Sequence, residues 1–212
     1  CVAGFPQVWG KLFGGGLDDL GRGLVAVADG LLVVGTAASA NLPGGQKSAG
    51  LTDVWLARID AAGSLLWNKT YGGSAGDSGA AAVALTNGFV VAGASDSKDL
   101  PGAAGNAGDN DGWLLRTDSD GKLVWSKTYG GSGGDTLNCL VAVADGFLAG
   151  GQTTSTNLPG GVKSLGVEDL WLVRTDLLGN PLWQKAYGGA GTEAATALVV
   201  LNDGFAAIGI AA

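Results

Sequence analysis

Residues 67–73, Trp-Asn-Lys-Thr-Tyr-Gly-Gly, occur again in closely related form at 125–131 (Trp-Ser-Lys-Thr-Tyr-Gly-Gly) and at 183–189 (Trp-Gln-Lys-Ala-Tyr-Gly-Gly). The N-terminal counterpart, residues 9–15, reads Trp-Gly-Lys-Leu-Phe-Gly-Gly. Successive copies are 58 residues apart. A fixed internal period of this kind is typical of architectures in which each repeat is one supersecondary unit.

Each repeat carries signals for four short strands. In the first repeat, residues 24–28 and 31–36 are apolar runs separated by Asp29-Gly30. Asp-Gly at this spacing favours a type I′ hairpin, in which both central residues have positive φ. Residues 54–59 and 65–71 indicate a second pair of strands around the turn at 60–63. No apolar stripe with a period of 3.6 residues is present, so long helices are not expected.

Four antiparallel strands in each repeat predict an all-β fold, namely a β-propeller of 58-residue four-stranded blades. The full repeats are 13–70, 71–128 and 129–186, and the chain 1–212 is one repeat domain. Residues 187–212 would supply the first two strands of a split fourth blade, and residues 1–12 its outer strand. The alternative is a β-solenoid, although solenoid coils are usually shorter and hairpins in every repeat fit blades better.

The split blade lacks the third strand of the pattern, so an unpaired strand edge is expected beside it. Three explanations remain open. The sequence is part of a longer array, or the fourth blade closes with three strands, or a neighbouring chain covers the edge. A head-to-tail contact that does not close generates filaments.

The repeat motifs also carry a family resemblance. The Tyr-Gly-Gly-Ser-Gly-Gly-Asp run at 129–135, together with the Trp-x-Lys-Thr-Tyr-Gly-Gly run at 125–131, resembles the repeats of prokaryotic surface and secreted β-propeller proteins. More distantly, the repeats are similar to WD40-like and PQQ-type blades. They lack the Gly-His pair and the Trp-Asp ending of WD40 repeats, and they lack the ligands of the quinone. The resemblance implies that the strand at 24–28 lies innermost and the Trp-x-Lys strand outermost, and it implies no cofactor.

The amino-acid composition argues against several classes of function. The chain has no His, which removes the commonest general base and metal ligand, and we expect no enzyme activity and no metal. The net charge of −7 argues against nucleic acid as a partner, and no apolar run is long enough to predict a membrane span. The stretches 109–112 and 118–121 contain two acidic residues each, but they lack the spacing of an EF-hand. They predict turns, with adventitious calcium as the lesser alternative.

Two residue series recur with the period of the repeat and predict structural roles. The Trp residues fall within expected strands, so packing between blades is favoured over stacking against sugars. Acidic residues just before the innermost strands, equally regular, predict a repeated acid–base arrangement with the Arg and Lys series. These structural positions are Trp55, Trp67, Trp113, Trp125, Trp171, Trp183, Asp19, Asp77 and Asp135.

Long segments at 37–52, 95–110 and 153–168 join the second and third strands. They are expected on one face of the propeller, and loops of this length are often functional. If the protein binds a ligand such as a glycan, this face is the predicted site. A lid of packed Ω-loops is the equal alternative. The candidate binding residues are Asn41, Lys47, Asp99, Asn106, Asn157 and Lys163.

The cysteines add little to these expectations. Cys139 occupies a position where the other repeats have Gly or Ala, which predicts a buried free thiol. Cys1 is compatible with lipidation or with a disulfide. The absence of Met and His, together with scarce charge, suggests an extracellular or cell-surface protein.

The sequence therefore predicts a non-enzymatic scaffold, without cofactor, that self-assembles into a filament or surface layer through the incomplete blade. A multivalent carbohydrate- or ligand-binding module that uses the long loops is the alternative. The expected partners are accordingly copies of the chain itself, or glycans.

Overall fold

The computed structural model describes residues 9–103 and 105–212, and in them the fold is all-β. Three four-stranded antiparallel sheets follow one another along the chain, and a two-stranded sheet follows the third. We call them blades 1 to 4. Blade 1 comprises β1 (Asp19–Val27), β2 (Gly30–Ala37), β3 (Asp53–Asp60) and β4 (Leu65–Tyr71).

The other blades repeat this pattern. Blade 2 comprises β5 (Asp77–Leu85), β6 (Gly88–Ser95), β7 (Asp111–Thr117) and β8 (Leu123–Tyr129). Blade 3 comprises β9 (Asp135–Val143), β10 (Gly146–Thr153), β11 (Asp169–Asp176) and β12 (Pro181–Tyr187). Blade 4 comprises β13 (Glu193–Leu201) and β14 (Gly204–Ala211). The only helical turns in the described residues are two short 3-10 turns, Pro43–Gly45 and Pro159–Gly161, in long loops.

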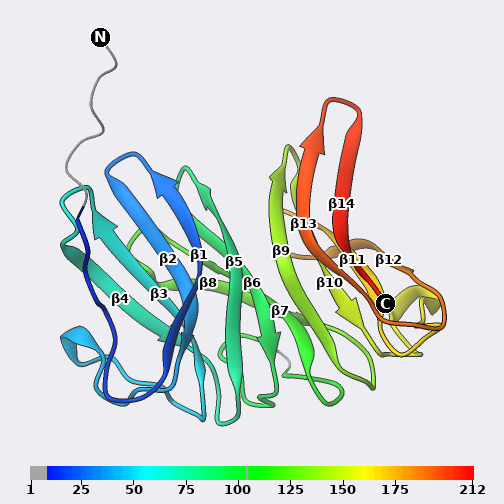
Figure 1. Ribbon diagram of the computed structural model, residues 1–212, viewed down its shortest axis with the longest axis horizontal. Helices are drawn as coiled ribbons and strands as arrows, with labels where there is room; N and C mark the ends of the chain where they lie inside the picture. Colours follow the sequence, from blue (N-terminus) through cyan, green and yellow to red (C-terminus); the bar gives the residue numbers. More distant parts are fainter. Residues whose placement is uncertain (1–8, 104) are drawn as a thin grey trace.

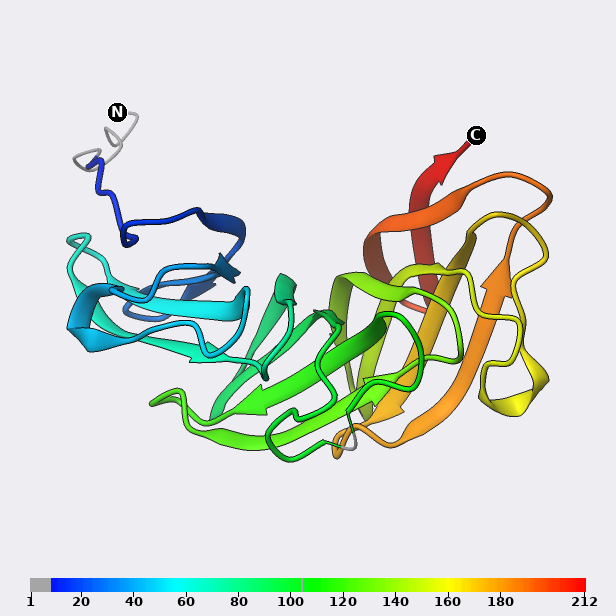
Figure 2. The same ribbon diagram turned by 90° about the horizontal axis from the view of Figure 1, so that it is seen from below.

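The blades stack in the manner of a propeller, and the stack forms an open arc (Figures 1 and 2). In each blade the strands pair in chain order, and the first strand contacts the first three strands of the preceding blade. β1, β5, β9 and β13 therefore lie side by side along the inside, as the resemblance implies. The Trp-x-Lys strand is the outermost. Meandering antiparallel sheets of this kind are blades rather than solenoid coils.

The hairpin between the first two strands differs from the predicted type I′ turn. Ala28 and Asp29 form the two-residue turn, and no residue other than glycine has positive φ in the described part of the chain. Gly30 instead opens β2 with φ 147°, and a Cβ there would lie 2.1 Å from the carbonyl oxygen of Ile59. The glycine is required because the third strand approaches closely, which a local turn rule does not anticipate.

The first strand of each blade is longer than the sequence indicates. β1 begins at Asp19 rather than at residue 24, and its pairing with β2 shifts register between Gly21 and Gly23. The same shift occurs in the other three blades. A bulge inserts one unpaired residue and reverses the alternation of side chains. The residues before the bulge therefore do not continue the apolar pattern of residues 24–28, and the sequence does not predict them as strand.

The core lies between blades rather than within them. One buried cluster joins Leu32 and Val34 of blade 1 to Phe89 and Trp113 of blade 2, and the next cluster joins blade 2 to blade 3 in the same way. We call the side of a blade that packs on the preceding blade its front face, and the opposite side its rear face. Burial at these junctions is the main stabilising contribution, because each sheet alone leaves both faces in water.

The expected outer strand of the split blade is not formed in the described part of the N-terminal segment. Residues 9–12 are not strand, and residues 1–8, which include Cys1, lie outside the described residues. Trp9 nevertheless donates its indole N–H to the carbonyl oxygen of Ala61 at 3.2 Å and lies against Gly63. Trp67 lies against Gly121 in the same way. Without a neighbouring third strand, this segment has no ladder to join.

The predicted burial of Cys139 is confirmed. Its thiol is free and buried, and it donates to the carbonyl oxygen of Gly150 at 3.3 Å. A Cβ on Gly150 would lie 3.0 Å from Cys139 Sγ and 3.1 Å from the Cβ of Ala195, so the thiol faces the junction of blades 3 and 4. Removal from water disfavours the thiolate, and the pKa of Cys139 is raised to about 11. We expect Cys139 to resist alkylation by iodoacetamide in the native protein at pH 8 and to react fully in urea, as measured by peptide mass spectrometry. Rapid native labelling would contradict the packing of blade 4 on blade 3.

Candidate functional site

The free end of the blade array presents an apolar sheet face. On the rear face of blade 4, Ile208 and Ile210 are 67% and 59% exposed, and Val199 and Leu201 beside them are also exposed. β14 has no strand partner on its outer edge in the described part of the chain. A regular apolar surface next to an unpaired edge is a marker of an interaction site.

The same face is core in the other blades. Ile208 occupies the position of Val34 in blade 1, and Val34 is fully buried beneath blade 2. Val199 and Leu201 correspond to Val25 and Val27, which pack against the same cluster. The side chains on the rear face of blade 4 therefore resemble those of a junction between blades, and no further blade covers them among the described residues.

At the opposite end of the array, the front face of blade 1 also exposes an apolar side chain. Leu24 on β1 is 69% exposed, whereas its counterpart Leu140 on β9 is buried against blade 2. Trp55 and Ala57 on the same blade are covered by Leu42 and Phe13. On the front face of blade 1, the inner strand is therefore exposed to solvent, whereas the outer strands are covered.

Figure 2 shows blades 1 and 4 at the two ends of the arc, which is open toward one side of the molecule. Among the described residues, no strand pairing links blade 4 to blade 1, and no sheet joins the two ends. Both ends of the arc therefore carry exposed apolar side chains, on the rear face of blade 4 and on the inner strand of blade 1.

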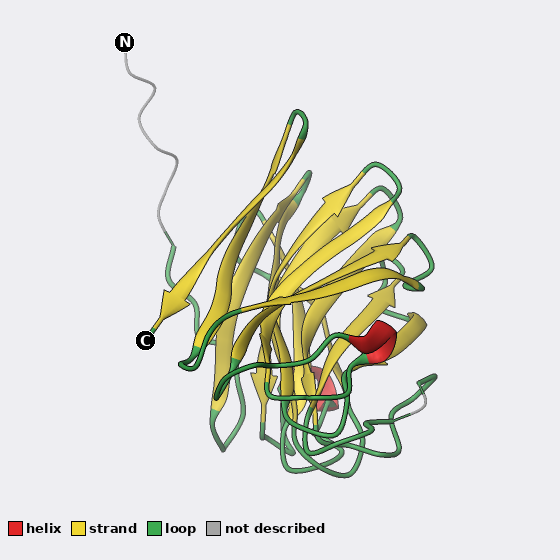
Figure 3. Cartoon of the chain, turned by 90° about the vertical axis from the view of Figure 1, so that its right-hand side faces the viewer, coloured by secondary structure: helices red, strands yellow, loops and turns green. Residues whose placement is uncertain are grey.

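The predicted binding residues of the long loops divide into two groups. The side-chain oxygens of Asn41, Asp99 and Asn157 each accept a backbone N–H from the turn before the first strand of the same blade: Gly16, Ser74 and Ser132, each at 2.8 Å. These side chains hold the loops down. The loops gather at one end of the strands (Figure 3). Their polar groups are thus engaged in the fold, as in the lid interpretation.

The other three loop residues are less engaged. Lys47 and Lys163 are exposed, and the sequence correctly matches them as equivalent positions. Asn106 is half-buried, and its amide donates to the carbonyl oxygens of Ser95 and Asp109. Asn106 Oδ1 is buried without a hydrogen-bond partner. The two lysines lie on different blades, and neither they nor Asn106 lines the larger cavities between the blades.

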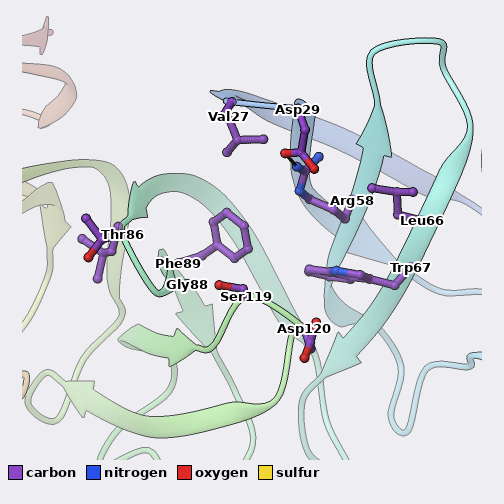
Figure 4. Close-up of a pocket in the computed structure, with 12 residues that line it drawn as sticks. Val27, Asp29, Arg58, Leu66, Trp67, Thr86, Gly88, Phe89, Ser119 and Asp120 are labelled. Carbon is purple, nitrogen blue, oxygen red and sulfur yellow. Dashed lines mark hydrogen bonds and ion pairs between the residues drawn. The ribbon is translucent and has the colours of Figure 1, made fainter.

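A cavity of about 500 Å³ lies between blades 1 and 2 at the hairpin end of the strands (Figure 4). Trp67 and Phe89 stand on opposite sides of it, with ring centroids 6.2 Å apart, and the ion pair of Arg58 with Asp29 borders it. A similar cavity of about 450 Å³ lies at the next junction, lined by Arg116 and Phe147 among others. Because it recurs, the cavity reflects the divergence of neighbouring blades.

The predicted acid–base arrangement is placed differently from the expectation. Arg58 and Arg174 pair with the hairpin residues Asp29 and Asp145, not with the acidic residues before the innermost strands. Asp77 instead caps its own blade: it accepts hydrogen bonds from the Gly73 N–H and the Ser97 hydroxyl, both at 2.8 Å, and from the Ser95 hydroxyl. The acidic residue at the start of the first strand therefore has a structural role, but it is held by neutral hydrogen-bond donors and not by Arg or Lys.

The acidic stretch 118–121 forms the predicted turn, whereas the stretch 109–112 runs into β7, which Asp111 opens. Asp118 accepts the backbone N–H groups of Asp120 at 3.0 Å and of Lys122 at 2.8 Å. Among the described residues, no group of three or more Cys, Asp or Glu side chains is placed to hold a metal ion, and no helix is long and apolar enough to cross a membrane.

The sequence interpretation did not single out Ile208 and Ile210. The signal was available for Ile208, because it falls in register with Val34, Ala92 and Gly150, all of which are buried. Ile210 falls in register with Thr36, Ala94 and Gln152, a position that is not consistently apolar. Comparison with known proteins adds no direct evidence on function: no protein-family model matches the chain, and no curated protein matches it.

Proposed function

We propose that the chain is a non-enzymatic extracellular scaffold that associates head to tail with further copies of itself. The rear face of blade 4 in one copy would pack on the front face of blade 1 in the next. The observation that carries this proposal is the exposure of Ile208, with Ile210 on the same strand, on a sheet face that is core in blades 1 and 2.

The existing junctions provide the model for the contact. Blade 2 covers Val34 with its inner strand and its front face, and Leu24 of a second copy would meet Ile208 in the equivalent place. The contact joins unlike surfaces, so each addition leaves a new free end. Such an interface gives a ring if the rotation closes and a filament if it does not. The incomplete fourth blade is thereby part of the joint.

The glycan-binding alternative has less support. The polar side chains at positions 41, 99 and 157 are engaged with their own blades, and the exposed Lys47 and Lys163 belong to different blades.

The test is the assembly state of the purified protein, measured by light scattering on a sizing column and by negative-stain imaging of the same fractions. We expect species larger than the 20.9 kDa monomer, increasing with protein concentration. Ile208→Lys should return the protein to the monomer, because a buried unpaired ammonium is strongly unfavourable in an apolar contact.

The matched control is Leu182→Lys. Leu182 is apolar and exposed, as Ile208 is. Its counterparts Leu66 and Val124 are also exposed, so this position faces solvent in every full blade. We expect it to leave assembly unchanged. A wild-type protein that stays monomeric at all concentrations, or an equal effect of both substitutions, would refute the head-to-tail contact.

A further inference from the structure

Pairs of carboxylates face each other at every junction between blades. At the second junction Asp111 opens β7 of blade 2, and Asp135 opens β9 of blade 3. A Cβ on Gly130, which lies between them, would be 2.4 Å from Asp111 Oδ1 and 2.7 Å from Asp135 Oδ2. Both oxygens therefore border the same small space, and only glycine fits beside them.

The arrangement recurs at the other two junctions. Around Gly72, the corresponding distances are 2.4 Å to Asp53 Oδ1 and 2.6 Å to Asp77 Oδ2. Around Gly188, they are 2.5 Å to Asp169 Oδ1 and 2.4 Å to Glu193 Oε2. In each pair, one acid comes from the third strand of a blade and the other from the first strand of the next.

The oxygens that face this space are not equally satisfied. Asp135 Oδ2 accepts the Gly131 N–H at 2.8 Å and the Ser155 hydroxyl at 2.7 Å. Asp111 Oδ2 accepts the Ala107 N–H at 2.7 Å, but Asp111 Oδ1 is buried without a hydrogen-bond partner. Asp169 Oδ1 is unpartnered in the same way. Asp111 and Asp169 are only 2% and 1% exposed.

A buried carboxylate oxygen without a donor, facing a second carboxylate, is electrostatically unfavourable. The ion pairs found in the described part of the chain involve Arg58 and Arg174 with other acids. Burial raises the pKa of Asp111 to about 6, and the charge of Asp135 adds to the effect. The pKa of Asp53 and that of Asp77 are also raised, mainly by burial.

Asp19 provides an internal comparison. It holds the same place in blade 1 and accepts the Gly15 N–H at 2.6 Å and the Ser39 hydroxyl at 2.7 Å. No blade precedes it in the structure, so no acid faces it from a third strand. Burial acts to raise its pKa, but its hydrogen bonds outweigh burial and the pKa is lowered. Asp19 is partly exposed, whereas Asp77 is only 1% exposed, so the raised pKa of Asp77 follows mainly from burial under the preceding blade, with the charge of Asp53 as a smaller contribution.

We propose that these carboxylate pairs bind divalent cations between adjacent blades, with Asp111 and Asp135 forming the best-defined site. An all-oxygen set with two carboxylates suits a hard cation, and the flexible coordination of calcium fits ligands from two separate strands better than the strict octahedron of magnesium. Because no third acid is at hand among the described residues, hydroxyl or carbonyl oxygens and water would complete the coordination. The cation would then link each blade to the next.

The proposal does not depend on self-assembly, since all three pairs lie within one chain. The test uses the full-length protein freed of divalent ions with a chelator and then titrated with calcium chloride in a calorimeter. Thermal unfolding is followed in parallel. We expect saturable binding and a rise in the unfolding temperature of the wild type.

Asp111→Asn is the informative variant. Asparagine retains an oxygen for the Ala107 N–H and places an amide donor opposite Asp135, so we expect the calcium-free variant to be more stable than the calcium-free wild type. It should also bind one calcium ion fewer. Asp169→Asn should act likewise at the third junction. Asp19→Asn, the control, should leave both the stoichiometry and the calcium-induced temperature shift unchanged.

Two results would overturn the proposal. The first is a wild type that shows neither binding heat nor a temperature shift. The second is a protein indifferent to calcium whose stability rises as the pH is lowered from 7 to 5, with the rise absent in Asp111→Asn. A group with a raised pKa binds its proton more tightly in the folded state, so this result would make a shared proton, and not a cation, the ligand of the pair.

Discussion

Trp171→Ala should lower the free energy of unfolding by about 3–5 kcal/mol, the range for truncating a fully buried aromatic side chain. Trp171 is fully buried between blades 2 and 3, in the cluster that contains Phe147 and Leu137. Its ring lies close to Gly112, and its indole N–H donates to Gln184 Oε1 at 3.2 Å. Truncation would leave a cavity bounded by two rigid sheets, which limits relaxation.

The outer Trp series supplies the control. Trp183 is only half-buried on the outermost strand, where it stacks on Phe205 at a centroid distance of 6.1 Å. We expect Trp183→Ala to cost about 1 kcal/mol, in the range of an aromatic pair. Urea denaturation followed by circular dichroism measures both. Equal losses for the two variants would contradict the division into a buried inner series and a peripheral outer series.

Gly93→Ala should be as damaging or more so, with an expected loss of about 3 kcal/mol or more, at the upper end of overpacking. A Cβ on Gly93 would lie 1.8 Å from the carbonyl oxygen of Ser78 on the neighbouring strand. This obstacle is backbone, and the bulge between Gly79 and Ala81 holds it there. The strand pair would have to separate locally to admit the methyl group.

Gly189→Ala is the corresponding control, because a Cβ there would meet nothing within 4 Å. We expect a change of no more than about 0.5 kcal/mol, as at other open surface positions. The measurement is again urea denaturation, with expression level as a second indicator for Gly93→Ala. If Gly93→Ala is tolerated as well as Gly189→Ala, the close strand approach at the bulge is not present in solution.

Much of the architecture could be predicted from particular residues. The 58-residue recurrence of Trp-x-Lys and of Asp-Gly or Asn-Gly places four strands in each repeat, and these local signals act within a few residues of each other. The small residues that the other repeats have at the position of Cys139 predicted its burial, and they reflect a packing constraint that every repeat shares. The outer position of the Trp-x-Lys strand came from the resemblance, since strand order across a sheet is not a local property.

Other features escaped prediction for physical reasons. The hairpin turn is formed by Ala28-Asp29 and not by the expected Asp29-Gly30. Gly30 is instead required because the backbone of Ile59, almost thirty residues away, leaves no room for a Cβ. The facing of Asp111 and Asp135 also depends on how two sheets stack. Neither residue is unusual in its own segment, and a sequence rule based on spacing within one loop does not bring them together.

The amino-acid sequence alone determined the repeat length, the strands of each blade and the all-β class, because hairpin propensity and apolar alternation are short-range properties repeated along the chain. The tertiary structure decided which surfaces became core, which carboxylates came to face one another and which ends of the array stayed open. Those outcomes arise between blades, where burial and electrostatics depend on neighbours distant in sequence. Val34 and Ile208 occupy the same repeat position, and only the presence or absence of a following blade makes one core and the other surface.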